Sequence, residues 1–344
     1  MASCNPDNYR IAVLTDHGEK ENVVKAWIPV VDYLSVQIPN STFEVVPLYY
    51  DEFSPVVSNN SVDFFYSNPM LYVEMARLHG AGRIATFQPT WNNSTYAGMG
   101  GVIFTKNERD DINSLQDLKG RSFIAVNEHS LGGYLAANGE FHQNDISSYD
   151  FSKLTFANSQ EDVVFSVIEG KADAGTVRSG VLESMISDGS MDADEIKILN
   201  MKEYNDYPFA VSTELYPDWV FAKTKNTPDD ISKEITIALL SMPSNSEAAI
   251  SIGASGWTVP ADYSPVDRLM RELSYGMYVG HDKISFKEAC SQHWYVLVFF
   301  ILIVALFEVH SHWMLDRKKK SQLEASNRLK DLFTDIMRHD LMNL

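Results

Sequence analysis

Short polar motifs that follow apolar runs supply the side chains best suited to bind a small molecule. The segment "AVNEHSLGGY" places Ser130, Gly132 and Gly133 after an apolar run and at the start of a predicted helix. Unpaired backbone N–H groups and the positive end of the helix dipole gather at such a position, which is typical of an anion site. An ordinary N-cap followed by a glycine-containing first turn explains the same residues equally well.

Other candidate residues also follow predicted strands. Arg178 ends the run "GTVR", and its guanidinium can bind an oxyanion through two parallel hydrogen bonds. The remaining candidates are Thr15, His17, Tyr66, Ser67, Asn68, Ser159 and Gln160. Taken singly, each fits a capping or surface role better than a ligand contact. The prediction depends on the set, because ligands of open α/β sheets bind beyond the carboxyl ends of the strands.

Charge and cysteine content exclude several functions. The chain has 28 basic and 46 acidic residues and a net charge of −18, which argues against a nucleic-acid partner. Cys4 and Cys290 form neither a disulfide framework nor a metal cluster, and we expect no metal and no cofactor. A hydrolase is the least favoured function, because no GxSxG motif and no metal-spaced histidine pair occurs.

Strand and helix signals alternate along most of the chain. Val23, Trp27, Val30, Val31 and Leu34 recur at helical spacing and predict one buried helix face. Strands are predicted at 9–15, 42–50, 62–68, 83–89, 100–106, 122–127, 153–159 and 172–178, and helices at 21–38, 70–80, 113–120, 128–141, 160–170, 228–242, 246–255 and 265–277. The alternation predicts an α/β protein of two lobes with largely parallel sheets.

An apolar run near the end of the chain predicts one membrane-spanning helix. Residues 294–307 carry no charge, and the apolar-dominated stretch to Leu315 has about the length of a membrane span. Tryptophans at both ends fit the two interfaces, and the basic residues 317–320 place the C-terminus in the cytoplasm. We therefore expect a span at 294–315 in a single-pass protein of the cell membrane, with residues 1–292 outside the cell. A buried core helix is the alternative.

The first ten residues, "MASCNPDNYR", lack the basic and apolar regions of a signal peptide. The segment "MASC" is similar to the end of a lipoprotein cleavage site at Cys4, which would place the natural start further upstream. The favoured interpretation is that these are simply frayed first residues.

Several ordered segments resemble a known family. They are "YSNPMLYVEMARLHGAGRIATF", "GGVIFTK", "LQDLKGRSFIAVNEHSLGGYLAA", "FSVIEGKADAGTVRSGVLE" and "GWTVPADYSPV". They resemble the phosphonate-binding type of periplasmic substrate-binding protein, and more closely the version fused to sensor histidine kinases such as the tetrathionate sensor.

The resemblance implies a periplasmic-binding-protein type II clamshell at about 9–290. Lobe 1 would comprise about 9–101 and 208–280, and lobe 2 about 102–207, with ligand bound in the cleft. Phosphonate binders of this type usually have a histidine where Gln160 stands. Its absence, together with Arg178, favours a different small oxyanion of sulfur or phosphorus.

The final segment "RHDLMNL" resembles the H-box of histidine kinases. The resemblance implies that His339 accepts a phosphoryl group and that Asp340 orients the imidazole or acts as its base. Leu344 replaces the usual proline. Residues 316–344 are expected to form a cytoplasmic helix that pairs with its twin in a homodimer. A charged helix with a chance His-Asp pair is the alternative.

These features together predict a membrane-anchored sensor. It would bind a small, anionic solute outside the cell and signal to a phosphoacceptor helix, with a response regulator or a separate kinase module as partner. No Gly-rich nucleotide-binding region follows His339, so we expect part of a sensor histidine kinase and no complete enzyme. The alternative is the substrate-binding component of a phosphonate or oxyanion importer, tethered at its C-terminus.

Overall fold

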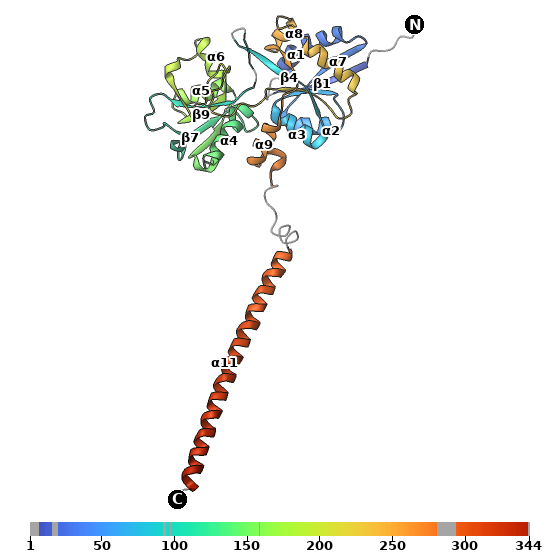
Figure 1. The fold of residues 1–344 in the computed structure, drawn as a ribbon. Helices are drawn as coiled ribbons and strands as arrows, with labels where there is room; N and C mark the ends of the chain where they lie inside the picture. Colours follow the sequence, from blue (N-terminus) through green and yellow to red (C-terminus); the bar gives the residue numbers. More distant parts are fainter. Residues whose placement is uncertain are drawn as a thin grey trace. The chain divides into compact units, whose positions relative to one another are not determined.

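Two mixed β-sheets, each covered by helices on both faces, make up the larger part of the protein (Figure 1). The computed structural model describes residues 7–15, 20–91, 94–96, 98–157, 159–280 and 294–342. The chain divides into two compact units, Met1–Val279 and Gly280–Leu344. His17, a predicted site residue, lies outside the described residues.

The first sheet has the strand order β12-β4-β11-β3-β1-β2, and β5 pairs with β4. Its strands are β1 (Asp7–Leu14), β2 (Ser41–Leu48), β3 (Phe64–Ser67), β4 (Gly82–Trp91), β5 (Ser94–Thr95), β11 (Val220–Lys223) and β12 (Ala254–Thr258). One face packs on α1 (Lys20–Gln37), α7 (Asp229–Leu240) and α8 (Glu247–Ser251), and the other on α2 (Tyr50–Ser58), α3 (Pro69–His79) and α9 (Ser264–Glu272). Ile11 and Ala12 of β1 point to opposite faces, as the pleat requires.

The second sheet has the order β10-β6-β9-β7-β8. Its strands are β6 (Gly101–Lys106), β7 (Ser122–Ala125), β8 (Lys153–Phe156), β9 (Ala174–Arg178) and β10 (Ile196–Leu199). The helices α5 (Gln160–Ile168) and α6 (Val181–Ser187) cover one face, and α4 (Ala136–Gln143) covers the other. Short helical turns at η1 (Leu115–Leu118), η2 (Leu131–Leu135), η3 (Ser148–Asp150) and η4 (Ala193–Glu195) connect these elements.

The α/β class is confirmed, but the expectation of largely parallel sheets is wrong. β1 runs parallel to β2 and β3, and β7 runs parallel to β8 and β9. The other strands, β4, β5, β6, β10, β11 and β12, pair in antiparallel fashion. The chain crosses between the sheets twice. The strand that follows each crossing runs antiparallel to the strands of the β–α–β units.

The two crossing segments pair with each other between the lobes. Met99 and Tyr216 exchange both backbone hydrogen bonds, with N···O distances of 2.7 and 2.8 Å. The hydroxyl of Thr213 accepts a hydrogen bond from Gly101 N–H at 2.9 Å. These bonds satisfy backbone groups where the chain leaves one sheet for the other.

One apolar cluster continues from the first lobe into the second. It contains Phe65 of β3 and Phe123 of β7. Where α4 meets α9, a Cβ added to Gly139 would lie 2.5 Å from Leu269 Cδ1. A side chain at position 139 would therefore displace the Leu269 side chain from its present place.

Several elements are absent from the sequence prediction, namely α2, α6, β5, β10, β11 and β12. Strands of two to five residues carry too few side chains for a clear alternation. Tyr50, predicted to end a strand, instead begins α2.

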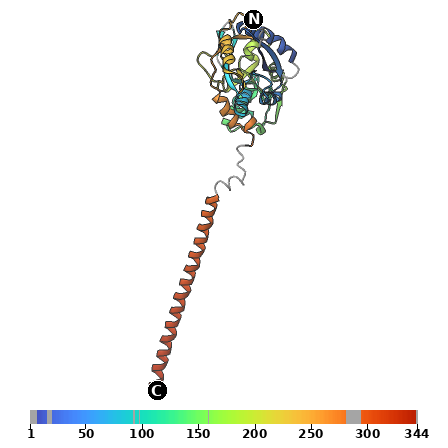
Figure 2. The same ribbon diagram turned by 90° about the vertical axis from the view of Figure 1, so that its right-hand side faces the viewer.

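The second unit contains α11 (Trp294–Met342), a single uninterrupted helix of 49 residues (Figure 2). Among the described residues, no helix combines the length and the apolar character that crossing a bilayer requires. The predicted span at 294–315 is therefore not confirmed. The side chains of His339 and Asp340 lie outside the described part of the structure.

Packing of α1 on the first sheet can be tested with two residues of the same helix. Leu34 is fully buried and Val36 is 77% exposed. Leu34→Ala should lower the free energy of unfolding by about 2–5 kcal/mol, because it removes packed atoms and leaves a cavity. Val36→Ala, the control, should change it by less than about 0.5 kcal/mol. Urea unfolding followed by tryptophan fluorescence measures both, and equal effects would contradict the assigned face.

Candidate functional site

An ion pair joins the two lobes. Arg178 ends β9 of the second sheet, and Asp218 lies just before β11 of the first. The Nη2 of Arg178 donates to Oδ2 of Asp218 at 2.6 Å. The Asp218 side chain is 1% exposed and that of Arg178 is 28% exposed. The carboxylate is thus buried, whereas part of the guanidinium still reaches open space.

Burial and charge act in opposite directions on this pair. Burial raises the pKa of Asp218, and the nearby Arg178 cation limits the rise. Desolvation opposes the charge of Arg178, but Asp218 raises the guanidinium pKa overall. The N–H of Trp219 also donates to Asp218 Oδ1 at 2.7 Å, which favours the ionised carboxylate.

Three tyrosines surround the ion pair. They are Tyr66 of β3, Tyr96 after β5, and Tyr207 in the second crossing segment. Burial raises the pKa of each phenol, and the charges of Arg178 and Asp218 act on all three. The phenols therefore remain protonated at neutral pH and can donate hydrogen bonds. The Tyr207 hydroxyl is already hydrogen bonded to Ser179 Oγ at 2.6 Å.

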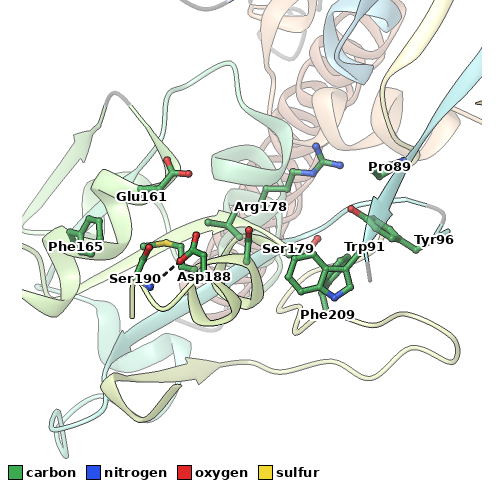
Figure 3. A pocket seen from close by; sticks show the side chains of 14 residues that line it. Pro89, Trp91, Tyr96, Glu161, Phe165, Arg178, Ser179, Asp188, Ser190 and Phe209 are labelled. Atoms are coloured by element: carbon green, nitrogen blue, oxygen red, sulfur yellow. Dashed lines mark hydrogen bonds between the residues drawn. The ribbon is translucent and has the colours of Figure 1, made fainter. Parts of the chain in front are cut away.

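A cavity of about 310 Å³ opens beside Arg178 (Figure 3). Its lining residues are Pro89, Trp91, Tyr96, Glu161, Phe165, Arg178, Ser179, Gly180, Val181, Ser184, Met185, Asp188, Ser190 and Phe209. The ring of Phe209 packs against those of Trp91 and Tyr96, with centroids 5.4 and 4.7 Å apart. The cavity has the size of a small-molecule site and combines aromatic walls with several polar and charged side chains.

Part of the predicted set gathers around Arg178. The Oε1 of Gln160 accepts a hydrogen bond from the Arg178 N–H at 3.0 Å. A Cβ on Gly132 would lie 3.0 Å from Arg178 Cγ, so the glycine gives the arginine side chain room. Tyr66 joins this group from the other lobe. The ligand-binding role of these residues stays a prediction.

Other predicted residues act as local caps. Ser130 Oγ accepts from Gly133 N–H, Ser159 Oγ accepts from Asp162 N–H, and Asn68 Oδ1 accepts from Leu71 N–H. Thr15 and Ser67 are buried, and the Ser67 hydroxyl donates to the Asn68 carbonyl. Capping, left open by the sequence, therefore accounts for the oxygen atoms of Ser130, Ser159 and Asn68, and their ligand contacts stay a prediction.

A second contact between the lobes is made by His129, in the loop after β7. Its ring stacks on Tyr50 of α2, with centroids 4.3 Å apart. Its Nδ1 is hydrogen bonded to the Tyr275 hydroxyl, and its carbonyl accepts from Asn68 Nδ2 at 3.4 Å. The Tyr50 hydroxyl donates to Glu74 Oε2 at 2.9 Å, and burial raises the pKa of Glu74.

The sequence prediction missed Asp218, His129 and the aromatic wall of Trp91, Tyr96, Tyr207 and Phe209. Asp218 precedes a four-residue strand that the pattern did not reveal. The aromatic residues lie on or beside crossing segments, where no strand or helix signal locates them. Proximity to Arg178 arises from the fold, so no local motif marks it.

Comparison with known proteins gives consistent results. A family model described as "ABC transporter, phosphonate, periplasmic substrate-binding protein" matches residues 12–264. The tetrathionate sensor histidine kinase TtrS of Salmonella typhimurium is 26% identical over 323 residues, covering 93% of this chain and 53% of the relative. This chain thus spans about half the length of that protein.

Two solved structures share the fold. PhnD1 from Prochlorococcus marinus, in complex with methylphosphonate, has a TM-score of 0.59 at 16% identity, over 78% of this chain and 99% of that one. XAC2383 from Xanthomonas citri, bound to ATP, has a TM-score of 0.59 at 14% identity, over 77% and 95%.

Removing Arg178 should expose the cost of the buried carboxylate. Arg178→Ala should lower the free energy of unfolding by about 3–5 kcal/mol, because Asp218 loses its cation. The double variant Arg178→Ala/Asp218→Asn should recover part of this loss. Since the pKa of Asp218 is raised, the carboxyl gains a proton as pH falls, and the loss in Arg178→Ala should shrink towards acid pH.

The matched control is Arg121→Ala, which breaks an exposed ion pair with Asp111. It should cost no more than about 1 kcal/mol. Denaturant unfolding over a range of pH measures all three variants. Equal losses in the single and double variants would contradict the role assigned to the buried charge.

Proposed function

Because the chain belongs to the phosphonate-type family of periplasmic substrate-binding proteins, we propose that residues 7–280 are the extracytoplasmic input domain of a membrane-anchored sensor. The domain binds a small oxyanion between its lobes. The observation that carries this proposal is the cavity at the Arg178–Asp218 pair, where groups from both lobes meet. A ligand held there contacts both lobes and so favours one relative arrangement of them.

Arg178 is the main ligand-binding group in this proposal. Asp218 occupies one Nη2 hydrogen, and the other guanidinium N–H groups remain for an oxyanion. Tyr66 and the Ser130–Gly133 turn, whose Gly132 lies against Arg178, complete the proposed site.

His129 carries the change in lobe arrangement to the end of the domain. It belongs to the second lobe, yet its partner Tyr275 lies in the first lobe, directly before η5 (Gly276–Tyr278). η5 is held on the first lobe because the Tyr278 hydroxyl donates to Asp267 Oδ1 at 2.5 Å. Movement of His129 therefore pulls on the segment through which the chain leaves the domain.

The downstream part of the proposal rests on the sequence. Residues 294–315 anchor the chain in the membrane, the C-terminus is cytoplasmic, and α11 pairs in a homodimer. His339 accepts a phosphoryl group in a two-component relay, with a response regulator or a separate kinase module as partner. The relationship to a tetrathionate sensor histidine kinase supports this order of parts.

A transport function is the second candidate, because the matching family model is named for an importer component. In that case the tethered domain hands its solute to a membrane transporter. This function requires neither the His129–Tyr275 contact nor His339.

A thermal-shift screen tests ligand binding. Phosphonates, phosphite, sulfite, thiosulfate, tetrathionate and sulfate are added in turn to the purified chain. A ligand that binds the folded domain should raise the Tm as its concentration increases. At one hundred times its Kd, it should increase the free energy of unfolding by about 2.7 kcal/mol. The shift should disappear in Arg178→Ala and persist in Arg121→Ala. No shift with any of the oxyanions would contradict the proposed input.

Hydrogen exchange tests the transmission step. Any ligand found by that screen should alter amide exchange at residues 275–280 in the natural chain. His129→Ala should bind the ligand with an affinity within a few-fold and lose that alteration. His142→Ala, an exposed histidine of the same lobe, should behave like the natural chain. A ligand-dependent change that survives in His129→Ala would show that signalling does not pass through this contact.

A further inference from the structure

The cavity beside Arg178 contains little positive charge. Among its described lining residues, Arg178 is the basic one, whereas Glu161 and Asp188 are acidic. The buried Asp218 already neutralises the guanidinium. Figure 3 shows the guanidinium pointing toward Pro89 and Tyr96, away from Glu161 and Asp188. Part of the cavity wall is thus an arginine already paired with a buried carboxylate, and two acidic side chains line the cavity elsewhere.

The guanidinium still has hydrogen-bond donors to offer. Asp218 accepts from Nη2, and within the described part of the chain no other side chain or carbonyl accepts from the guanidinium. The remaining N–H groups form a planar fork, which fits the two oxygen atoms of one carboxylate or sulfonate. One carboxylate or sulfonate group can therefore accept hydrogen bonds from the guanidinium N–H groups that Asp218 does not use.

The surrounding groups add hydrogen bonds without adding charge. Tyr66 is 9% exposed and therefore largely buried. The charges of Arg178 and Asp218 act on this phenol, which places it beside the pair. Tyr96 lines the cavity itself, and Trp91 and Phe209 add apolar surface. A protonated phenol beside the pair can donate a hydrogen bond to an oxyanion without adding charge.

We propose that Asp218 selects the charge of the ligand, so that the cleft prefers an organic oxyanion with one negative charge and an apolar body over one with two charges. This inference rests on the proposed function and specifies its ligand class. The ligand and Asp218 share one guanidinium, so each unit of ligand charge is repelled by the buried carboxylate. For a second charge, the attraction of Arg178 is offset by Asp218, and no second cation occurs among the described lining residues. The desolvation of that second charge is therefore not compensated, which should cost at least about tenfold in affinity.

Four ligands in two matched pairs test the proposal on the full chain. Methanesulfonate is compared with methylphosphonate, and benzenesulfonate with phenylphosphonate, at an alkaline pH where the phosphonates carry two charges. Within each pair the shape is the same and the charge differs. The concentration dependence of the Tm gives each Kd. Each sulfonate should bind at least about tenfold more tightly than its phosphonate, and benzenesulfonate should bind more tightly than methanesulfonate.

Asp218→Asn removes the charge and keeps the size of the side chain. It should strengthen phosphonate binding at least about tenfold and strengthen sulfonate binding less. The preference for each sulfonate over its matched phosphonate should therefore become smaller or reverse. Asp230→Asn, an exposed residue of α7, makes the same change in net charge and should leave the preference unchanged.

Tighter phosphonate binding by the natural chain would overturn the charge selection and leave the proposed function standing. Equal ratios of sulfonate to phosphonate affinity in Asp218→Asn and Asp230→Asn would also overturn the charge selection and leave the proposed function standing. If none of the four ligands binds, the ligand class is wrong, and the oxyanion screen decides the proposed function separately. If Asp218→Asn does not fold, the comparison within the natural chain is sufficient by itself.

Discussion

The Arg178–Asp218 ion pair is the contact on which the arrangement of the two lobes depends. A carboxylate that is 1% exposed must be paired, because an isolated buried charge is too costly to retain. Its partner, Arg178, lies at the end of a strand in the other sheet. The Asp218 carboxylate is therefore paired only when the second lobe places Arg178 next to it. The arginine is in turn positioned by Gln160 and by the space that Gly132 leaves.

The other contacts between the lobes act around this pair. The crossing segments are joined at Met99 and Tyr216, and α4 meets α9 at Gly139. His129 bridges the lobes at a third place and reaches Tyr275, next to the last turn of the domain. The two lobes are thus joined around the ion pair at three further places: the paired crossing segments, the apolar contact between α4 and α9, and the hydrogen bond between His129 and Tyr275.

The aromatic surroundings and the charge balance belong together. Tyr66, Tyr96 and Tyr207 remain neutral because burial raises their pKa, so they supply hydrogen bonds around the pair without adding charge. A motif search for basic residues recognises Arg178 as an anion site. The same residue next to a buried carboxylate belongs to a pair with no net charge.

The sequence by itself determined the α/β class, the helix faces such as that of Trp27 and Leu34, and the family, because periodicity and ordered motifs are local properties of the chain. It also singled out Arg178, which ends β9, and Tyr66 of β3, whose ligand-binding roles stay a prediction. Tertiary structure alone decided that the sheets are mixed, that the oxygen atoms of Ser130, Ser159 and Asn68 serve as caps, and that Asp218 faces Arg178. Residues 178 and 218 belong to different lobes, and their proximity results from two chain crossings that no local pattern encodes.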